Sequence, residues 1–228
     1  MLHPHRGPVP LLCLALLALL ACDPALPSAP EATSIGESPV AAAHSPANGT
    51  GVYQFSDMSQ VGSSTLNRHG NSVSMTIHTS GIPAGMAVTV WWVVFNVPEN
   101  CATSPCGEPD IFDPAVRADV LYAAGHVTGN GPHRNFAGQL RRGDASGSIM
   151  PFFNALLGID LPSLGLERVD GAEIHLVVRT HQQAIPAYMP DMISTFNGGC
   201  TYPPGVPTDF GAPGPNTCSD LQFAIHQP

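Results

Sequence analysis

The sequence predicts an all-β protein, an antiparallel β-sandwich with long Pro/Gly-rich loops and at most one short helix. Its apolar segments are short, rich in β-branched or aromatic residues, and separated by Gly, Pro and Asn turns, with no long amphipathic helix among them. The 228 residues include 23 glycines and 24 prolines, a composition that suits a loop-rich β protein. A β-barrel is the alternative architecture, because strand patterns do not reveal strand order.

Seven segments carry the strand pattern. In chain order they are 51–55, 72–80, 87–97, 120–128, 135–141, 172–180 and 221–226. In the second segment Val73, Met75 and Ile77 share one face, and the third is apolar almost throughout, which predicts a central strand buried on both faces. The Gly-Asn-Gly-Pro sequence at 129–132 predicts a hairpin. The sequence of residues 150–158 predicts a short helix or an apolar loop over one end of the sheets.

The first 21 residues have the pattern of a secretory signal peptide, with Arg6 near the start and an apolar run up to Ala21. This run is shorter than the roughly 20 residues that a membrane span needs. It ends in the sequence Leu-Leu-Ala-Cys at 19–22, which closely resembles the bacterial lipobox. The resemblance implies cleavage before Cys22, acylation of that cysteine with palmitate-type chains, and export to the cell membrane or envelope. It leaves the membrane leaflet open, and an ordinary signal peptide with a chance cysteine is the alternative.

The rest of the chain divides into a tether and one domain. Residues 22–50 are rich in Pro, Ala, Ser and Glu and have no apolar period, which predicts a lipidated flexible tether. Residues 51–228 are numerous enough to build one domain with its own hydrophobic core. The expected organisation is therefore a signal peptide (1–21), a tether (22–50) and a single β domain (51–228).

Four of the six cysteines remain after one leaves with the signal peptide and Cys22 takes the lipid. An even number of cysteines in an exported protein predicts disulfides. Among the three pairings we favour the local ones, Cys101–Cys106 and Cys200–Cys218. A zinc site is the alternative, but neither pair has the tight Cys-x-x-Cys spacing that such sites usually show.

The net charge and the absence of known motifs argue against several classes of function. The formal net charge is −9, the chain contains no lysine, and its arginines form no basic cluster, which argues against nucleic acid as a partner. The sequence has no Gly-x-Ser-x-Gly elbow, no phosphate-binding glycine loop and no His-Glu-x-x-His motif. It therefore gives no ground for expecting an enzyme.

Histidines are the main candidates for functional residues. Side chains alternate along a strand, so in the segment 172–180, continued to His181, one face is polar and the other is apolar. The polar face carries Glu173, His175, Val177, Arg179 and His181, and the apolar face carries Ile174, Leu176 and Val178. His78, His126 and His226 also lie on strands, at positions facing away from apolar neighbours. If the strands were adjacent, copper or zinc could bind to His175, His181, His78 and His226. The alternative is that these histidines simply occupy polar strand faces.

Aromatic side chains offer a different kind of site. Trp91 and Trp92 are consecutive, so one faces each side of its strand. Four aromatic residues lie in the loop-rich stretch 185–217, namely Tyr188, Phe196, Tyr202 and Phe210. Ordered long loops that carry aromatic residues are common recognition sites. The alternative is that these rings anchor the loop to the sheets.

Segments 91–96, 121–126 and 171–181 resemble uncharacterised secreted bacterial domains, and this resemblance supports the β fold without implying an activity. We expect an envelope-anchored lipoprotein that acts as a binding or structural surface module. Its partners would be the membrane, through the lipid, and an unidentified protein or small-molecule ligand, with no cofactor. The alternative is a histidine-ligated copper or zinc binding or redox protein.

Overall fold

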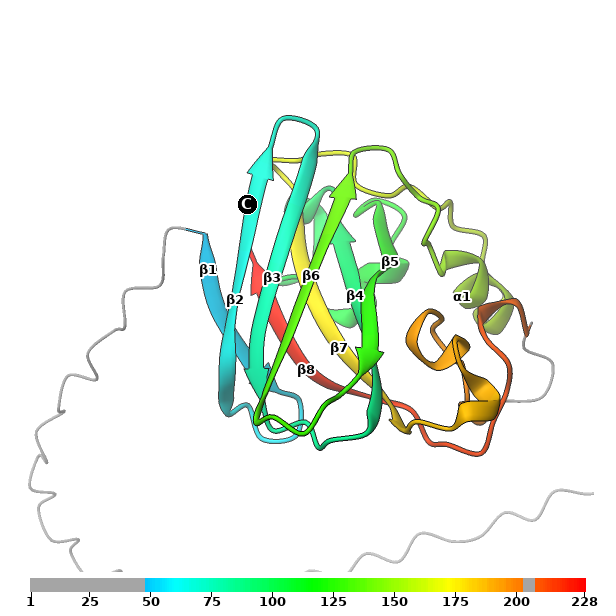
Figure 1. Ribbon diagram of the computed structural model, residues 1–228. Helices are drawn as coiled ribbons and strands as arrows, with labels where there is room; N and C mark the ends of the chain where they lie inside the picture. The colour runs from blue at the N-terminus through cyan, green and yellow to red at the C-terminus, as the bar shows by residue number, and fades with distance from the viewer. Residues whose placement is uncertain (1–47, 203–207) are drawn as a thin grey trace, which may run out of the picture. The chain divides into compact units, whose positions relative to one another are not determined.

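The computed structural model of the chain describes residues 48–202 and 208–228. The predicted signal peptide, Cys22 and nearly all of the predicted tether lie outside these residues. The described part contains eight strands (Figure 1). They are β1 (Gly49–Gln54), β2 (Gln60–His69), β3 (Ser72–Ser80), β4 (Met86–Phe95), β5 (Ala118–Val127), β6 (His133–Arg141), β7 (Glu173–Gln183) and β8 (Ser219–His226). One α-helix, α1 (Met150–Leu157), and five 3-10 turns complete the described elements. The turns are η1 (Pro98–Asn100), η2 (Glu108–Phe112), η3 (Pro186–Tyr188), η4 (Asp191–Ile193) and η5 (Thr208–Phe210).

All eight strands belong to one antiparallel sheet with the order β5-β4-β7-β8-β1-β2-β3-β6. The sheet curls until its two edge strands, β5 and β6, approach each other, so that it forms a nearly closed barrel (Figure 1). The predicted all-β class with one short helix is confirmed. Of the two architectures considered, the barrel describes the sheet, because a single sheet wraps around one core.

The hairpin predicted at 129–132 is wrong. The chain does reverse there, but β5 pairs with β4, and β6 pairs with β3. Turn residues determine where a chain reverses, whereas the curl of the whole sheet determines which ladder each strand joins. The outer edge of β5, which pairs with no other described strand, is hydrogen-bonded to the segment before α1. Tyr122 N donates to Gly147 O (3.0 Å), and Ile149 N donates to Val120 O (2.9 Å).

The barrel interior is the main hydrophobic core. The faces predicted for two strands are confirmed, because the apolar residues of both are buried together. These residues are Val73, Met75 and Ile77 of β3 and Ile174, Leu176 and Val178 of β7. Trp92 of β4 projects into the same core, and Trp91 projects to the other side of the sheet, as their consecutive positions predict.

Strand β2 has no counterpart among the predicted segments. Its sequence, Gln-Val-Gly-Ser-Ser-Thr-Leu-Asn-Arg-His, contains only Val61 and Leu66 as large apolar residues. Leu66 is buried in the core, and the buried Ser64 beside it donates a hydrogen bond to Thr76 O (3.0 Å). A strand that buries so little apolar surface gives no clear period-two pattern.

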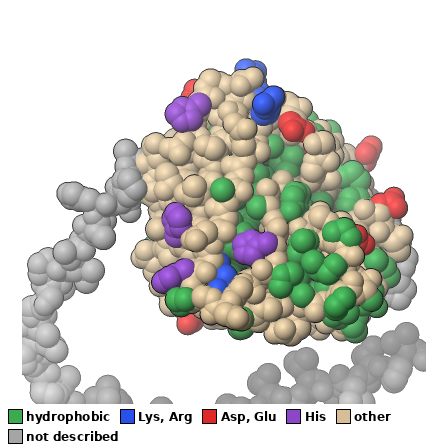
Figure 2. All heavy atoms as spheres, viewed as in Figure 1, with side chains coloured by type: hydrophobic (Ala, Val, Ile, Leu, Met, Phe, Trp, Pro, Cys, Tyr) green, Lys and Arg blue, Asp and Glu red, His purple; other side chains and the backbone are tan. Residues whose placement is uncertain are grey.

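A second layer covers part of the outer surface of the barrel. All ten residues of β4 are buried, which confirms the strand predicted to be buried on both faces. Its outward residues Trp91, Val93 and Phe95 form a second cluster with side chains from η2, α1 and the segment after η4. Figure 2 shows hydrophobic side chains gathered on the right-hand part of this face, over α1 and the residues following β7, whereas few lie over β1, β2 and β3.

Both predicted disulfides are present, Cys101–Cys106 and Cys200–Cys218. Each closes a loop within the second layer rather than joining strands of the barrel. The first precedes η2, and the second ties the segment after η4 to the start of β8.

Candidate functional site

A cavity of about 310 Å³ lies between the outer face of the sheet and its covering layer. The floor is formed by outward side chains of β4, β5 and β7, and the roof by η2, α1 and the segment after η4. Six aromatic residues line it: Phe55, Trp91, Phe95, Phe112, Phe153 and Phe196. We call this cavity the aromatic pocket. Ligand sites are typically concave and mostly apolar with a few placed polar groups, and the aromatic pocket has this composition.

The aromatic walls are held by edge-to-face packing. Trp91 contacts Phe196 with ring centroids 5.2 Å apart, and Phe112 contacts Phe153 with centroids 5.4 Å apart. Aromatic pairs prefer such perpendicular arrangements, which fix ring orientation as well as position. Because the paired rings come from different elements, the pocket is assembled only when the covering layer docks on the barrel.

One polar side chain, His175, faces the pocket from the floor and is paired with Glu173 behind it. His175 Nε2 lies 2.7 Å from Glu173 Oε1, and the same oxygen accepts a hydrogen bond from Cys106 N (2.7 Å). The Glu173 side chain is 3% exposed and that of His175 is 14% exposed. Phe95 packs against the imidazole, with ring centroids 4.9 Å apart. The Cys101–Cys106 loop thus fixes the carboxylate, which in turn orients the imidazole.

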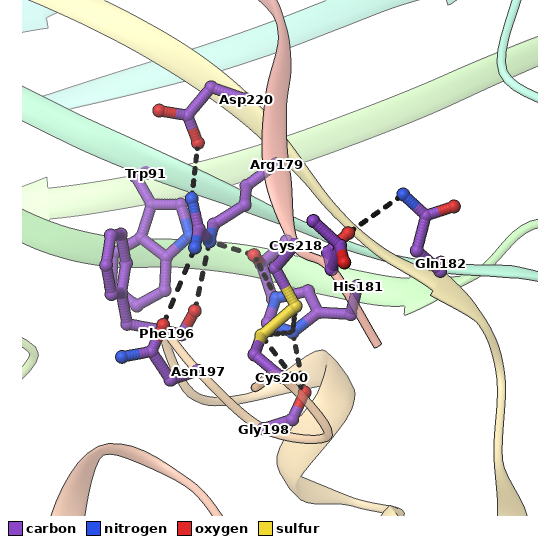
Figure 3. Close-up of polar contacts among 12 residues, drawn as sticks. Trp91, Arg179, His181, Gln182, Phe196, Asn197, Gly198, Cys200, Cys218 and Asp220 are labelled. Carbon is purple, nitrogen blue, oxygen red and sulfur yellow. Dashed lines mark hydrogen bonds and ion pairs between the residues drawn. A yellow bond between two sulfur atoms is a disulfide. The ribbon is translucent and has the colours of Figure 1, made fainter. Parts of the chain in front are cut away.

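A second polar group, Arg179, contacts the Phe196 wall of the pocket (Figure 3). The Arg179 guanidinium lies 4.2 Å from the centroid of the Phe196 ring, and its Nε donates to Phe196 O (3.0 Å). Its Nη1 donates to Asp220 Oδ1 at 2.9 Å. Arg179 therefore fixes the Phe196 wall through a cation–π contact and a backbone hydrogen bond.

His181 is fully buried between β4 and the Cys200–Cys218 disulfide (Figure 3). Its Nδ1 donates to Gly198 O (2.8 Å), and its Nε2 accepts a hydrogen bond from Thr89 Oγ1 (3.0 Å). The Thr89 hydroxyl also accepts from the indole of Trp91 (2.8 Å). Burial is the main cause that lowers the pKa of His181 to about 4, so the imidazole is neutral at pH 7. His181 therefore connects Trp91 of the pocket wall, through Thr89, with Gly198 of the covering loop.

The four candidate metal-binding histidines do not converge. His175 lies on the outer face of β7, whereas His226 projects into the barrel and bonds to Ser64 Oγ at 2.9 Å. His78 is exposed on β3, three strands away from β8 in the sheet, and bonds to Asn135.

His226 faces away from the apolar residues of its strand, as predicted, but the face that it occupies is the interior of the barrel. Gln222, Ala224 and His226 of β8 face the barrel interior, and the apolar residues between them face outward. The interior polar groups find partners on neighbouring strands, since Gln222 Oε1 accepts from Thr79 Oγ1 at 2.8 Å. Burial, followed by electrostatic interactions with Arg68 and His175, lowers the pKa of His226 to about 4.

Another set of residues is close enough to hold a metal ion. The Nδ1 atom of His181 lies 3.5 Å from Cys200 Sγ and 3.8 Å from Cys218 Sγ. The two sulfur atoms are bonded to each other, so they offer no thiolate ligands in this state.

The sequence pointed to part of the aromatic pocket. Glu173, His175 and Arg179 were predicted to share one face, Trp91 and Trp92 were predicted to face opposite sides of their strand, and Phe196 stood among the loop aromatics. The roof formed by η2 was missed. A helical turn was signalled there by Pro109 at its start and by Asp110, whose Oδ2 accepts a hydrogen bond from Gly107 N (2.7 Å).

Comparison of the chain with protein-family models, curated proteins and solved structures finds no match. Within the described ranges no helix is both long and apolar enough to cross a lipid bilayer.

Proposed function

We propose that the β domain is a binding module that takes up a small, largely apolar molecule in the aromatic pocket. The observation that carries the proposal is the cavity of about 310 Å³ walled by six aromatic rings, with His175, which is hydrogen-bonded to Glu173, on its floor. Its volume is at the lower end of the roughly 300–1,000 Å³ found for small-molecule sites. A ligand would bury aromatic surface against preformed walls, which favours binding without large rearrangement.

The lining favours binding over catalysis. The described residues that form the pocket include no serine, threonine, cysteine or lysine that could act as a nucleophile. Its polar side chains are His175, Glu108 and Asp220, and the last is already paired with Arg179. One oriented imidazole in an apolar cavity is better suited to selecting a ligand than to completing a reaction.

Filling the cavity is expected to abolish binding while leaving the fold intact. Val177 lines the pocket, so Val177→Phe would place a ring in the space that a ligand needs. We expect N-phenyl-1-naphthylamine, an uncharged fluorescent probe, to bind the wild-type domain, and Val177→Phe to weaken this binding at least about tenfold, or ~1.4 kcal/mol. Fluorescence titration measures both affinities.

The control is Val127→Phe, the same substitution at the exposed end of β5, which should leave probe affinity unchanged. Equal probe binding by wild type and Val177→Phe, with both variants folded, would exclude the aromatic pocket as the site.

We further propose that the domain is held at the cell envelope by lipid on Cys22. The lipobox-like sequence at 19–22 and the tether composition of 22–50 support this proposal. Cys22→Ser is expected to abolish metabolic labelling with palmitate, whereas Cys13→Ser, within the leader, should retain it. Labelling that survives Cys22→Ser would contradict the anchor.

Metal binding is a second candidate function, favoured by the approach of His181 to Cys200 and Cys218. Tetrahedral zinc, with Zn–S of about 2.3 Å and Zn–N of about 2.0 Å, needs N···S separations close to those already present. Because the sulfurs are joined, we expect cobalt(II) or zinc to bind only after reduction, and more weakly in His181→Asn. Absence of stoichiometric metal after reduction, measured on protein that remains folded, would exclude this function.

A further inference from the structure

His175 lines the aromatic pocket, and one of its ring nitrogens has no hydrogen-bond partner among the described residues. Its Nε2 is engaged by Glu173, and its Nδ1 has no hydrogen-bond partner among the described residues. The only fully buried side-chain nitrogen or oxygen without a partner in that part of the chain is Arg134 Nε. The Nδ1 atom of His175 is therefore not fully buried, and the His175 side chain lines the pocket.

Glu173 determines which hydrogen-bonding role this nitrogen plays. Its Oε1 faces both Cys106 N and His175 Nε2, each at 2.7 Å. An ionised carboxylate only accepts hydrogen bonds, so the imidazole nitrogen beside it must carry the hydrogen. In the neutral imidazole the other nitrogen, Nδ1, then has a lone pair and acts as an acceptor.

The charges around the pocket disfavour an anionic ligand. Glu108 and Asp220 line the pocket, and Glu173 lies behind His175, whereas no lysine or arginine is among the lining residues. Arg179 is nearby, but its charge is shared with Asp220. A ligand carboxylate would be placed among like charges without a cation of its own.

We propose that the pocket selects aromatic or alicyclic molecules that carry one uncharged hydroxyl group, which donates a hydrogen bond to His175 Nδ1. This inference rests on the proposed binding function and adds the class of ligand. A ligand that donates a hydrogen bond to a buried acceptor binds more tightly, and a ligand that leaves this acceptor unpaired binds more weakly. An ammonium group also donates, but of the two carboxylates that line the pocket Asp220 is already paired with Arg179 and Glu108 is exposed to solvent, so neither compensates a desolvated ammonium.

Four naphthalene derivatives that share one ring system test the selection at pH 8. They are 2-naphthalenemethanol, its methyl ether, 2-naphthoate and 2-(aminomethyl)naphthalene. Affinities are measured by displacement of N-phenyl-1-naphthylamine from the purified domain and by calorimetry. We expect the alcohol to bind at least about fivefold tighter than the ether and tenfold tighter than the naphthoate and the amine, factors typical of one hydrogen bond or one buried charge.

Two substitutions at His175 separate its hydrogen-bonding role from its shape. His175→Phe keeps a ring but removes the acceptor, and should bring the alcohol and ether affinities within about twofold of each other. His175→Gln can donate to Glu173 through its amide and still present a carbonyl acceptor, so it should retain the preference for the alcohol.

The outcomes distinguish this inference from the proposed function. If the probe and all four compounds fail to bind, the binding function itself is wrong. If the four bind alike, or the naphthoate or the amine binds most tightly, the pocket binds ligands but the hydroxyl selection is wrong. A preference for the alcohol that persists in His175→Phe would assign the selection to another group.

Discussion

Acidification from pH 7 to pH 4 is expected to lower the free energy of unfolding of the domain by several kcal/mol. Two histidines, His181 and His226, are buried in neutral form, and burial lowers the pKa of each from 6.5 to about 4. Between these values the unfolded chain binds protons that the folded chain excludes, so stability falls as the pH falls. The loss is on the order of 3 kcal/mol for each histidine, a large part of a typical folding free energy of about 5–15 kcal/mol.

Other groups modify this pH dependence without reversing it. Burial raises the pKa of Asp119, so its contribution has the opposite sign: it is present at low pH and is lost as the pH rises through the folded pKa. Hydrogen bonds lower the pKa values of Asp57 and Asp144, whose stabilisation is present above their normal values near 3.8 and is lost below them. Both of these carboxylates are exposed and screened, so their effect is small and falls at the acidic end of the window.

Urea unfolding at a series of pH values between 4 and 8 measures the effect. His226→Gln and His181→Asn should each reduce the slope of stability against pH, whereas His78→Asn, at an exposed position, should leave the slope unchanged. A domain that is equally stable at pH 7 and pH 4.5 would show that neither imidazole is buried as described.

The predictability of the fold differed from strand to strand, and the reasons are physical. Strand β7 was predicted with the correct faces because three large aliphatic residues alternate with polar ones. Strand β8 alternates as clearly, but its polar residues face the interior, where Thr79 and Ser64 supply hydrogen-bond partners. The sequence of one strand cannot report partners that another strand brings.

The candidate site was also only partly predictable, because its roof depends on contacts between distant segments. Alternation placed Glu173, His175 and Arg179 on one face, and two of them now lie at the pocket or on its edge. Alternation also placed His181 on that face, but the covering loop buries it and gives it Gly198 O as a partner. The roof depends on how η2 and α1 dock, which is a long-range packing result without a local sequence pattern.

Removing the carboxylate of Asp119 is expected to be the most damaging single change in the covering layer. Asp119 is completely buried at the start of β5 and accepts four hydrogen bonds. Its Oδ2 accepts from Leu164 N and Gly165 N, both at 2.7 Å, and its Oδ1 accepts from Ser148 Oγ at 2.6 Å and from Val120 N at 2.8 Å. One side chain thus holds the residues on both sides of α1.

Asp119→Ala leaves these four donors without their acceptor in a buried place. Since one unsatisfied buried group costs about 1–3 kcal/mol, we expect a loss of roughly 4 kcal/mol or more in the free energy of unfolding. Asp119→Asn should cost less, about 2 kcal/mol, because the amide oxygen still accepts while its NH₂ group faces other donors. Asp113→Ala, which removes an exposed carboxylate bonded to Ala115 N, should cost under about 1 kcal/mol.

The same substitution also tests how the pocket is assembled. Phe153 of α1 forms part of the pocket wall, and Asp119 anchors α1 through Ser148 and Leu164. Asp119→Asn is therefore expected to weaken probe binding under conditions where the barrel is still folded, because the roof loses its anchor before the sheet unfolds. Probe titration and circular dichroism on one sample measure both properties. If stability falls but probe affinity equals that of wild type, the roof is held by its aromatic contacts alone, and Asp119 has no part in positioning it.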